Sequence, residues 1–336
     1  MSEVLVSIKC MVYNHEPYLR QCLDGFVMQK TDFAFEAIVH DDASTDNSAT
    51  IIREYEEKYP NIIKPIYETE NQYSKRNGSL RRIMDDAIAP SSIYIAVCEG
   101  DDYWTDPYKL QKQVDYMEAH PDCSLVCSRT AMCSEKQKRI IGEKYWYNHN
   151  QKLKTKEIIR RGGGAIPTVS VIYRKEIKDY YPEYCKRCAT GDHPLQLMSA
   201  VKGYVFYLND LTCVYRVHNS QSWIGRQKRR VADTARLKTL HSIIDMLKGF
   251  AKDYPQYRHA FKDRIAMYIL NELPNRYENE TALDAFKESF KNEIKEFRPW
   301  WRIDLYLRTT RIPVLKKYYY YANRIYCKYR SRIIRY

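Results

Sequence analysis

The sequence predicts an α/β fold in which a mostly parallel β-sheet is covered by helices on both faces. In residues 4–130, apolar segments of strand length alternate with segments of helical periodicity. Cap and turn residues separate these segments. Hydrophobic residues make up 44% of the 336 residues, which is enough for a substantial core and excludes a disordered chain. In sheets of this kind, ligands bind beyond the carboxyl ends of the strands.

The first part of the chain is interpreted as five strands separated by helices. Val4–Val12 is apolar and partly β-branched, as in a buried strand, and apolar residues at helical spacing follow it. Ser-Thr-Asp at 44–46 offers N-cap side chains, Pro60 ends the helix that follows them, and Asp106-Pro107 starts a later helix. The expected strands are Val4–Val12, Phe35–His40, Ile62–Tyr67, Ile93–Cys98 and Cys123–Cys127. The expected helices are Pro17–Met28, 47–59, 80–88 and one beginning at Pro107.

The rest of the chain changes character twice. Residues 131–224 are mixed, with strands expected at Thr168–Tyr173 and Leu211–Val217 and a short helix at Pro194–Ala200. From residue 226 the pattern is helical, with helices expected at Val231–Phe250, Tyr257–Leu273 and Thr281–Phe297. We therefore expect an α/β domain at 1–224, made of halves 1–130 and 131–224, then a helical region at 225–297 and a basic aromatic tail at 298–336.

Charge and cysteine content limit the environment of the protein. The net charge is +13, and the tail 298–336 holds eleven basic residues and one acidic residue, so the remainder is close to neutral. No apolar run is long enough to cross a membrane, and no secretory signal is recognised. The ten cysteines are scattered, which favours buried thiols in a reducing cytoplasm. The single pair Cys185 and Cys188 has C-x-x-C spacing but is weak evidence for zinc.

Three carboxylates follow the fourth expected strand in the segment AVCEGDDYW at 96–104. They are Glu99, Asp101 and Asp102. At the edge of a sheet, such charge is costly unless a cation neutralises it, and a divalent cation that also holds phosphate oxygens would do so. The alternative is an acidic turn that faces solvent. A second acidic cluster, Asp41, Asp42 and Asp46, follows the second strand; helix capping explains one of these residues but not the Asp41-Asp42 pair.

Three segments in this order and spacing resemble the family 2 glycosyltransferases. They are VSIKCMVYNHEPYLRQCLDGFVMQ, FEAIVHDDASTDNSATIIREY and YIAVCEGDDYW. The resemblance covers about residues 4–220 and implies the GT-A fold, a nucleoside diphosphate sugar as donor and inversion at the transferred sugar. It implies that the expected α/β domain at 1–224 is the catalytic domain. It also implies a divalent metal, Mn²⁺ or Mg²⁺, between the donor diphosphate and the carboxylates that follow the fourth strand.

The resemblance assigns the donor site residue by residue. Asp42 matches the residue that hydrogen-bonds the nucleotide base, and a carboxylate can accept from a uracil N3–H. Tyr13 and Glu16, after the first strand, would border that base. Glu99-Gly100-Asp101 matches the family D-x-D motif, with Glu in place of the first Asp. Asp101 and Asp102 are the candidates for ribose and metal contacts, and which residue makes which contact stays open.

The second half supplies the other candidate residues. Asp192, ahead of Pro194, matches the general base that takes the proton of the acceptor hydroxyl, although the family form Glu-Asp is Gly-Asp here. The alternative role of Asp192 is an N-cap. Tyr215-Arg216-Val217-His218 resembles the family Y-R-x-H segment. Arg216 would neutralise phosphate, and His218 would complete the metal shell or contact the diphosphate.

The expected function is metal-dependent transfer of a sugar from a UDP-sugar to a glycan or lipid-linked acceptor in the assembly of a bacterial surface polysaccharide, such as capsule or lipopolysaccharide. The tail 298–336 mixes Lys and Arg with Trp and Tyr, which favours an anionic membrane surface. Nucleic acid is the other polyanion that such a tail could bind, but the membrane is preferred because the resemblance suggests a lipid-linked acceptor, so no nucleic-acid partner is expected. Docking of the tail on the body is the remaining alternative. We expect a cytoplasmic protein, peripheral on the inner face of the membrane. A nucleotidyltransferase is the competing enzyme class, and it is disfavoured because YNHEPYL after the first strand has no glycine. A non-catalytic nucleotide-sugar-binding protein is the other alternative.

Overall fold

The computed structural model describes residues 3–75, 77–217, 234–272 and 280–297, together with 299, 302 and 305. The chain divides into two compact units. The first consists of 1–155, 163–181 and 192–233, and the second of 156–162, 182–191 and 234–336. Two short segments of the expected catalytic domain thus belong to the second unit. The expected boundary at residue 224 and almost all of the tail 298–336 lie outside the described residues.

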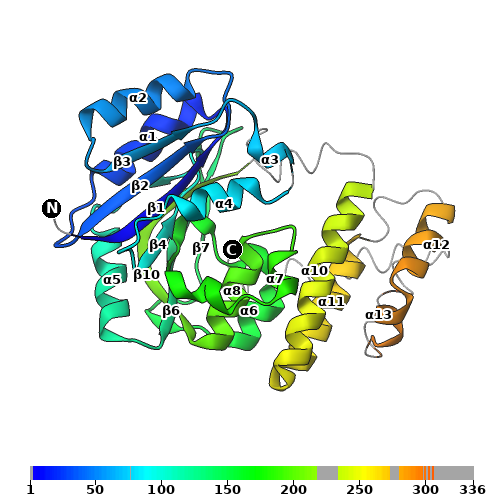
Figure 1. Ribbon diagram of the computed structural model, residues 1–336. Coiled ribbons are helices and arrows are strands. Elements are labelled where there is room, and N and C mark those ends of the chain that lie inside the picture. Colours follow the sequence, from blue (N-terminus) through cyan, green and yellow to red (C-terminus); the bar gives the residue numbers. More distant parts are fainter. Residues whose placement is uncertain are drawn as a thin grey trace. The chain divides into compact units, whose positions relative to one another are not determined.

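The first unit is built on one mixed sheet with flanking helices (Figure 1). The strand order is β3-β2-β1-β4-β9-β6-β10-β5, with β7 beside β6 and β8 beside β10. The strands are β1 (Val4–Val12), β2 (Ala34–Asp41), β3 (Ile63–Tyr67), β4 (Tyr94–Val97), β5 (Tyr103–Trp104), β6 (Cys123–Ser134), β7 (Arg139–Lys144), β8 (Gln151–Lys152), β9 (Ile172–Arg174) and β10 (Tyr204–Val217). The α/β fold class expected from the sequence is confirmed.

The two sides of this sheet differ in strand direction. Strands β3, β2, β1 and β4 are parallel, as expected for the first part of the chain, and β10 is parallel to β6. Strand β9 lies between β4 and β6 and is antiparallel to both. Strands β5 and β8 are antiparallel to β10, and β7 is antiparallel to β6. The parallel strands bring the ends of β1, β2 and β4 to one edge of the sheet.

Helices that flank the sheet follow the expected order along the chain. They are α1 (Glu16–Val27), α2 (Ser48–Lys58), α3 (Gln72–Lys75), α4 (Ser79–Asp86), α5 (Lys109–Ala119) and α8 (Asp192–Lys202). Leu19, Cys22, Leu23 and Phe26 form the buried face of α1, as their helical spacing predicts. Proline in the first turn of α1 suits a helix start, because the backbone N–H groups of the first turn have no acceptor within the helix and proline lacks this group.

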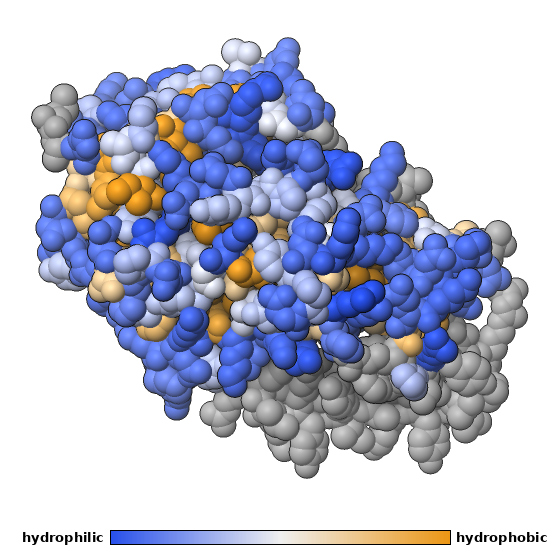
Figure 2. All heavy atoms as spheres, turned by 60° about the horizontal axis from the view of Figure 1, so that its bottom comes forward, coloured by the Kyte–Doolittle hydropathy of each residue, from blue (hydrophilic) through white to orange (hydrophobic). Residues whose placement is uncertain are grey.

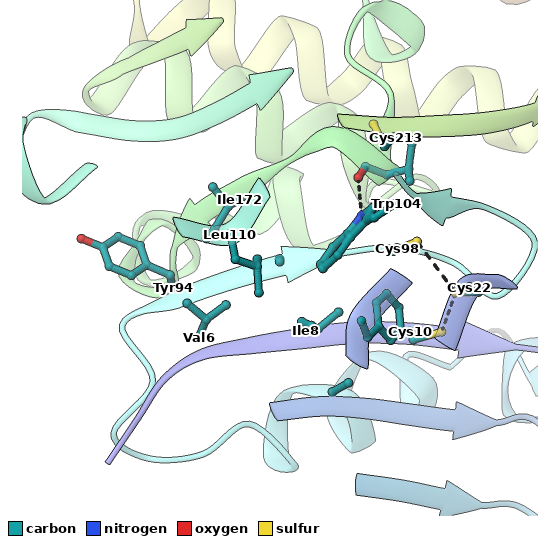
Figure 3. Packing of buried hydrophobic residues seen from close by; sticks show 14 of the residues in the cluster. Val6, Ile8, Cys10, Cys22, Tyr94, Cys98, Trp104, Leu110, Ile172 and Cys213 are labelled. Atoms are coloured by element: carbon teal, nitrogen blue, oxygen red, sulfur yellow. Dashed lines mark hydrogen bonds between the residues drawn. The ribbon is translucent and has the colours of Figure 1, made fainter. Parts of the chain in front are cut away.

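The core of this unit centres on Trp104 (Figure 3). Its indole Nε1 donates to the carbonyl oxygen of Val169 at 2.9 Å, and its ring meets Phe26 edge-on with centroids 5.0 Å apart. Next to it lie three fully buried thiols, with Sγ–Sγ distances of 4.0 Å from Cys10 to Cys22 and 3.9 Å from Cys22 to Cys98. The thiols of Cys22 and Cys98 also point to the carbonyl oxygen of Glu99, so the core reaches the carboxylate segment.

The second unit is helical. Helix α10 (Thr234–Asp253) packs against α11 (Arg258–Glu272), and Phe250 stacks on Phe261 between them. The short helix α7 (Glu183–Lys186) joins this unit, where the Tyr184 hydroxyl donates to Asp253 Oδ2 at 2.7 Å. The single helix expected at Thr281–Phe297 is two helices, α12 (Glu280–Ser289) and α13 (Lys291–Lys295), because the chain breaks at the buried Phe290.

The face seen in Figure 2 is largely hydrophilic, with hydrophobic residues in local patches. Within the described ranges, no helix combines the length and the apolar character needed to span a bilayer.

Candidate active site

The loops that follow β1 and β2 are bound to each other. Asn14 takes a left-handed backbone conformation (φ 56°), and its side-chain Oδ1 accepts the backbone N–H of Thr45 at 2.8 Å. Asp46 accepts the backbone N–H groups of Glu16 and Ser48, each at 3.0 Å, so one carboxylate serves the start of both α1 and α2. These hydrogen bonds hold the loops after β1 and β2 in fixed positions relative to each other.

Glu16 and Tyr13, expected beside the nucleotide base, lie in these loops. The Glu16 carboxylate accepts both the backbone N–H of Asn47 at 3.0 Å and its side-chain amide at 2.7 Å. Glu16 therefore holds the start of α2. Tyr13 is half-buried immediately after β1.

Asp42, the expected base reader, is buried at the end of β2. Its Oδ1 accepts the backbone N–H of Gln72 at 2.6 Å, and its Oδ2 accepts that of Tyr73 at 3.1 Å. Both residues open the short helix α3, so Asp42 caps that helix. A carboxylate has about four acceptor positions, which leaves capacity for a ligand donor beside these two bonds.

Its neighbour Asp41 is also buried, and burial raises the pKa of its carboxyl above the ordinary value.

The carboxylate segment after β4 is fastened to β1 through its backbone. Gly100 donates its N–H to the carbonyl oxygen of Met11 at 3.0 Å. A Cβ on Gly100 would lie 2.8 Å from Nδ1 of His15 and 2.9 Å from Cγ2 of Val12. Glycine is required at position 100 for a steric reason, because there is no room for a Cβ atom next to His15 and Val12.

Asp101 and Asp102 are both almost completely buried, with 6% and 3% of their surface exposed. Burial raises the pKa of Asp102 well above its ordinary value, and the neighbouring charges of Asp101 and Glu99 act in the same direction. One hydrogen bond opposes this shift, from the backbone N–H of Arg216 to Asp102 Oδ1 at 2.8 Å. The segment is therefore buried rather than a solvent-facing turn, and its clustered carboxyl groups are ones whose charge a bound cation would stabilise.

Arg216 closes the segment from the side of β10. Its guanidinium donates to the backbone carbonyl of Asp101 at 2.6 Å, pairs with Glu135 at 3.1 Å, and also bonds to Gln21. The rings of Tyr18 and Tyr103 lie 5.0 and 4.5 Å from its central carbon. Arg216 therefore connects strand β10 to the Glu99–Asp102 segment, and its guanidinium is bound by protein groups.

Asp192 is the first residue of α8, and its carboxylate acts electrostatically on Tyr215 and Lys144, as the carboxylate of Asp102 does. The pKa of the Tyr215 hydroxyl is raised first by burial and then by four carboxylates, those of Asp102, Glu99, Asp101 and Asp192. The pKa of Lys144 is lowered by burial, while Asp102 and Asp192 oppose that shift. The structure thus brings together the strand-end carboxylates and the predicted base, which are far apart in sequence.

Lys144 and Tyr215 are site residues that sequence reasoning missed. Tyr215 belongs to the quoted Y-R-x-H segment, which was a usable signal. Lys144 belongs to no motif, and only the pairing of β7 with β6 and of β6 with β10 brings it near the carboxylates. His218, the predicted metal ligand, lies outside the described residues.

The sequence matches the family described as Glycosyl transferase family 2 over residues 7–180. The chain belongs to glycosyltransferase family 2. This match covers the strand-end segments after β1, β2 and β4, and the resemblance inferred from the three motifs is confirmed.

Known relatives of this glycosyltransferase include proteins of several bacteria. An uncharacterized protein of Mycobacterium tuberculosis is 32% identical over 80% of this chain and 75% of its own length. The poly(ribitol-phosphate) beta-glucosyltransferase of Bacillus spizizenii is 37% identical over 29% of this chain and 15% of its own length.

The fold is shared with solved glycosyltransferase structures. The crystal structure of TarS from S. aureus aligns with a TM-score of 0.59 and 16% identity over 89% of this chain. This chain spans half of that TarS chain. A shorter form, TarS 1-349 in complex with UDP-GlcNAc, aligns with a TM-score of 0.54 and 16% identity, over 92% of this chain and 77% of that one.

The donor set of the motif fits a hard divalent cation. Among the described residues, no three His, Cys, Asp or Glu side chains converge as a complete metal site, and Cys185 and Cys188 gain no further ligand there. Mg²⁺ is usually bound by one or two carboxylates together with substrate phosphates and water, so a protein cage is not needed. Asp101 and Asp102 offer carboxylates of this kind, and the buried charge on Asp102 is what a cation would relieve.

Proposed function

We propose that this glycosyltransferase moves a sugar from a nucleoside diphosphate sugar, most simply a UDP-sugar, to an acceptor hydroxyl with inversion. The observation that carries the proposal is the common neighbourhood of Asp192, the Glu99–Asp102 segment, Lys144 and Tyr215. A base and a diphosphate-binding motif in one place are what such a transfer needs. The UDP-GlcNAc complex of TarS, a protein of the same fold, supports the choice of donor.

In this proposal the carboxylates of Asp101 and Asp102 hold Mn²⁺ or Mg²⁺. When bound, the metal neutralises the charge of the donor diphosphate. Glu99, one methylene longer than the family Asp, and Asp101 flank the donor ribose. Arg216 keeps this segment in place through its bonds to Asp101 and Asp102. His218 stays a proposed metal or diphosphate ligand on the strength of the sequence motif.

Asp192 acts as the general base. As the acceptor oxygen bonds to the anomeric carbon, the bond from that carbon to the phosphate oxygen breaks, and the hydroxyl proton passes to Asp192. Attack from the face opposite the diphosphate gives inversion. The first position of α8 suits this role, because a helix start favours a carboxylate in its ionised form.

Asp42 reads the donor base, with Tyr13 and Glu16 at its border. The two bonds from the α3 backbone fix the Asp42 carboxylate in one orientation, which would present its remaining lone pairs to a uracil N3–H. Glu16 contributes mainly by holding the loop that carries Tyr13.

The acceptor proposed is a glycan or a lipid-linked glycan of a bacterial surface polysaccharide. The poly(ribitol-phosphate) beta-glucosyltransferase among the relatives acts, by its name, on a polymer, which supports this class of acceptor. We also propose that the tail 298–336, with eleven basic residues among tryptophans and tyrosines, holds the protein at an anionic membrane.

The test of the reaction compares Asp192→Asn with the wild-type protein. Asparagine can still cap a helix but cannot take a proton, so kcat should fall by a factor of about 10² to 10⁴ with an unchanged melting temperature. UDP release from UDP-sugars measures the rate, and calorimetric titration with UDP, with and without Mn²⁺, measures donor binding. Asp106→Asn is the matched control, because Asp106 precedes α5, where its carboxylate accepts the backbone N–H of Tyr108 and pairs with Lys112.

Each outcome has a separate meaning. If the wild-type protein binds no nucleoside diphosphate with or without metal, the donor proposal is wrong. If it binds UDP and Asp192→Asn transfers sugar at the wild-type rate, the donor site stands and the base assignment fails.

A further inference from the structure

Lys144 is a second cation, besides Arg216, in a site rich in carboxylates. It is the last residue of β7, paired with Thr130 of β6, and Tyr215 on β10 lies along the opposite edge of β6. The Lys144 ammonium donates to the carbonyl oxygen of Gly164 at 3.1 Å and lies 5.7 Å from the centre of the Tyr215 ring. Three elements of the first unit therefore fix where this ammonium is held.

The charges around Lys144 come from two directions. Asp102 belongs to the segment after β4 and accepts the N–H of Arg216, the residue after Tyr215, at 2.8 Å. Asp192 begins α8, where the next residue, His193, packs against Gly163, beside the Gly164 carbonyl that Lys144 contacts. Both carboxylates act electrostatically on the ammonium. Among the described residues, Lys144 forms no ion pair with a nitrogen–oxygen distance of 4.0 Å or less. The carbonyl of Gly164 uses one of its three donors. Burial alone would favour the neutral amine, and the two carboxylates favour the charged form.

The position of this charge matters for the step proposed above. Negative charge develops on the departing phosphate oxygen as its bond to the anomeric carbon breaks, while the acceptor proton goes to Asp192. A fixed ammonium near that oxygen lowers the barrier, because it is already in place when the charge appears. Asp102 marks the diphosphate side of the site and Asp192 the acceptor side, and Lys144 interacts with both.

We propose that Lys144 is a substrate-binding residue that contacts the distal phosphate of the donor diphosphate and stabilises it as the leaving group. This inference rests on the proposed function, since it needs a nucleoside diphosphate donor at the motif. It adds a contact that none of the three sequence motifs contains.

The experiment measures binding of UDP and of UMP by calorimetry in the presence of Mn²⁺, for wild type, Lys144→Gln and Lys144→Arg. UMP lacks the distal phosphate. Lys144→Gln should weaken UDP binding at least about tenfold, the scale of a charge-assisted hydrogen bond, and leave UMP binding unchanged. It should also lower kcat, and Lys144→Arg should restore most of both. Lys152→Gln is the control, because Lys152 lies 3.9 Å from the Tyr204 ring in a comparable cation–π contact on β8.

The results separate this inference from the proposed function. If wild type binds UDP and Lys144→Gln binds it equally well, Lys144 does not contact the diphosphate. If Lys144→Gln weakens UDP and UMP binding to the same extent, the residue has only a structural role and the inference fails. A raised KM for the acceptor with unchanged UDP binding would also overturn it, and would place Lys144 at the acceptor. Wild-type protein that binds no UDP refutes the donor proposal itself.

Discussion

Gly100 decides how closely the carboxylate segment approaches β1. Replacing it with alanine would push the new Cβ into Nδ1 of His15 and Cγ2 of Val12, at 2.8 and 2.9 Å. We expect Gly100→Ala to lower the free energy of unfolding by about 1–3 kcal/mol, the usual cost of overpacking. Urea denaturation measures it. Gly191→Ala is the control, because nothing lies within 4 Å of a Cβ there. Equal stability of the two variants would contradict the close contact.

For single residues, the sequence shows which side chains are charged but not which groups they contact. Arg216 and Glu16 are predicted as substrate-binding residues from motif position, yet Arg216 is engaged by Glu135 and Gln21, and Glu16 by Asn47. These partners are distant in sequence, so no local pattern reports them. Asp101 and Asp102, by contrast, follow directly from their place after a strand, and the structure finds them buried at that edge.

Helix α5 contains a buried lysine, Lys109, whose burial lowers the stability of the folded protein at neutral pH. Lys109 is fully buried, donates to Gln113 Oε1 at 2.7 Å, and lies 4.3 Å from the Trp104 ring. Burial lowers its pKa from 10.5 to about 8. Below pH 8 both the folded and the unfolded chain bind this proton, and between pH 8 and 10.5 only the unfolded chain does. Stability from this group therefore rises with pH across that interval.

Lys109→Met should consequently raise the free energy of unfolding, relative to wild type, by more at pH 7 than at pH 10.5. The increase at pH 7 should exceed the increase at pH 10.5 by on the order of 3 kcal/mol. The variant lacks the hydrogen bond to Gln113 at both pH values, so the loss of this bond does not affect the difference between the two increases. Denaturation of both proteins at the two pH values checks this. Lys112→Met serves as control, because Lys112 is partly exposed and paired with Asp106 and Asp210. Equal increases for Lys109→Met at the two pH values would show that the folded and the unfolded protein bind this proton equally over the interval, and would contradict the lowered pKa of Lys109.

Elements with a long periodic pattern could be predicted from the sequence, and short ones could not. The alternation from β1 to β6 is found in the predicted order. Strands β5 and β8 have only two residues each, too few for a period. The strand expected at Thr168–Tyr173 is a 3-10 helix at Thr168–Ser170 followed by the three-residue β9, so only its last part is a strand. Lys144 was missed because its approach to Tyr215 depends on the pairing of β7 with β6 and of β6 with β10.

For the whole molecule, the uneven charge leads to a prediction about membranes. Full-length protein should float with vesicles that contain anionic lipid, and float less at high salt, because Lys and Arg near the surface attract the headgroups. A variant with Lys316, Lys317, Arg324 and Lys328 changed to Gln should lose most of this binding. The same number of Lys→Gln changes at 152, 154, 156 and 175 is the control. Equal flotation of all three proteins would exclude the tail as the membrane contact.

The position of β9 in the sheet also has a consequence for how this chain is made in the cell. Strand β9 separates β4 from β6, although its residues follow both in the sequence. While the ribosome is still producing residues 135–171, β4 and β6 each have an unpaired edge, and such edges pair readily with other chains. Strand β10, which bonds to Asp102 through Arg216, comes later still. The growing chain therefore exposes two strand edges over this interval, and Arg216 can bond to Asp101 and Asp102 only after residue 216 has been synthesised.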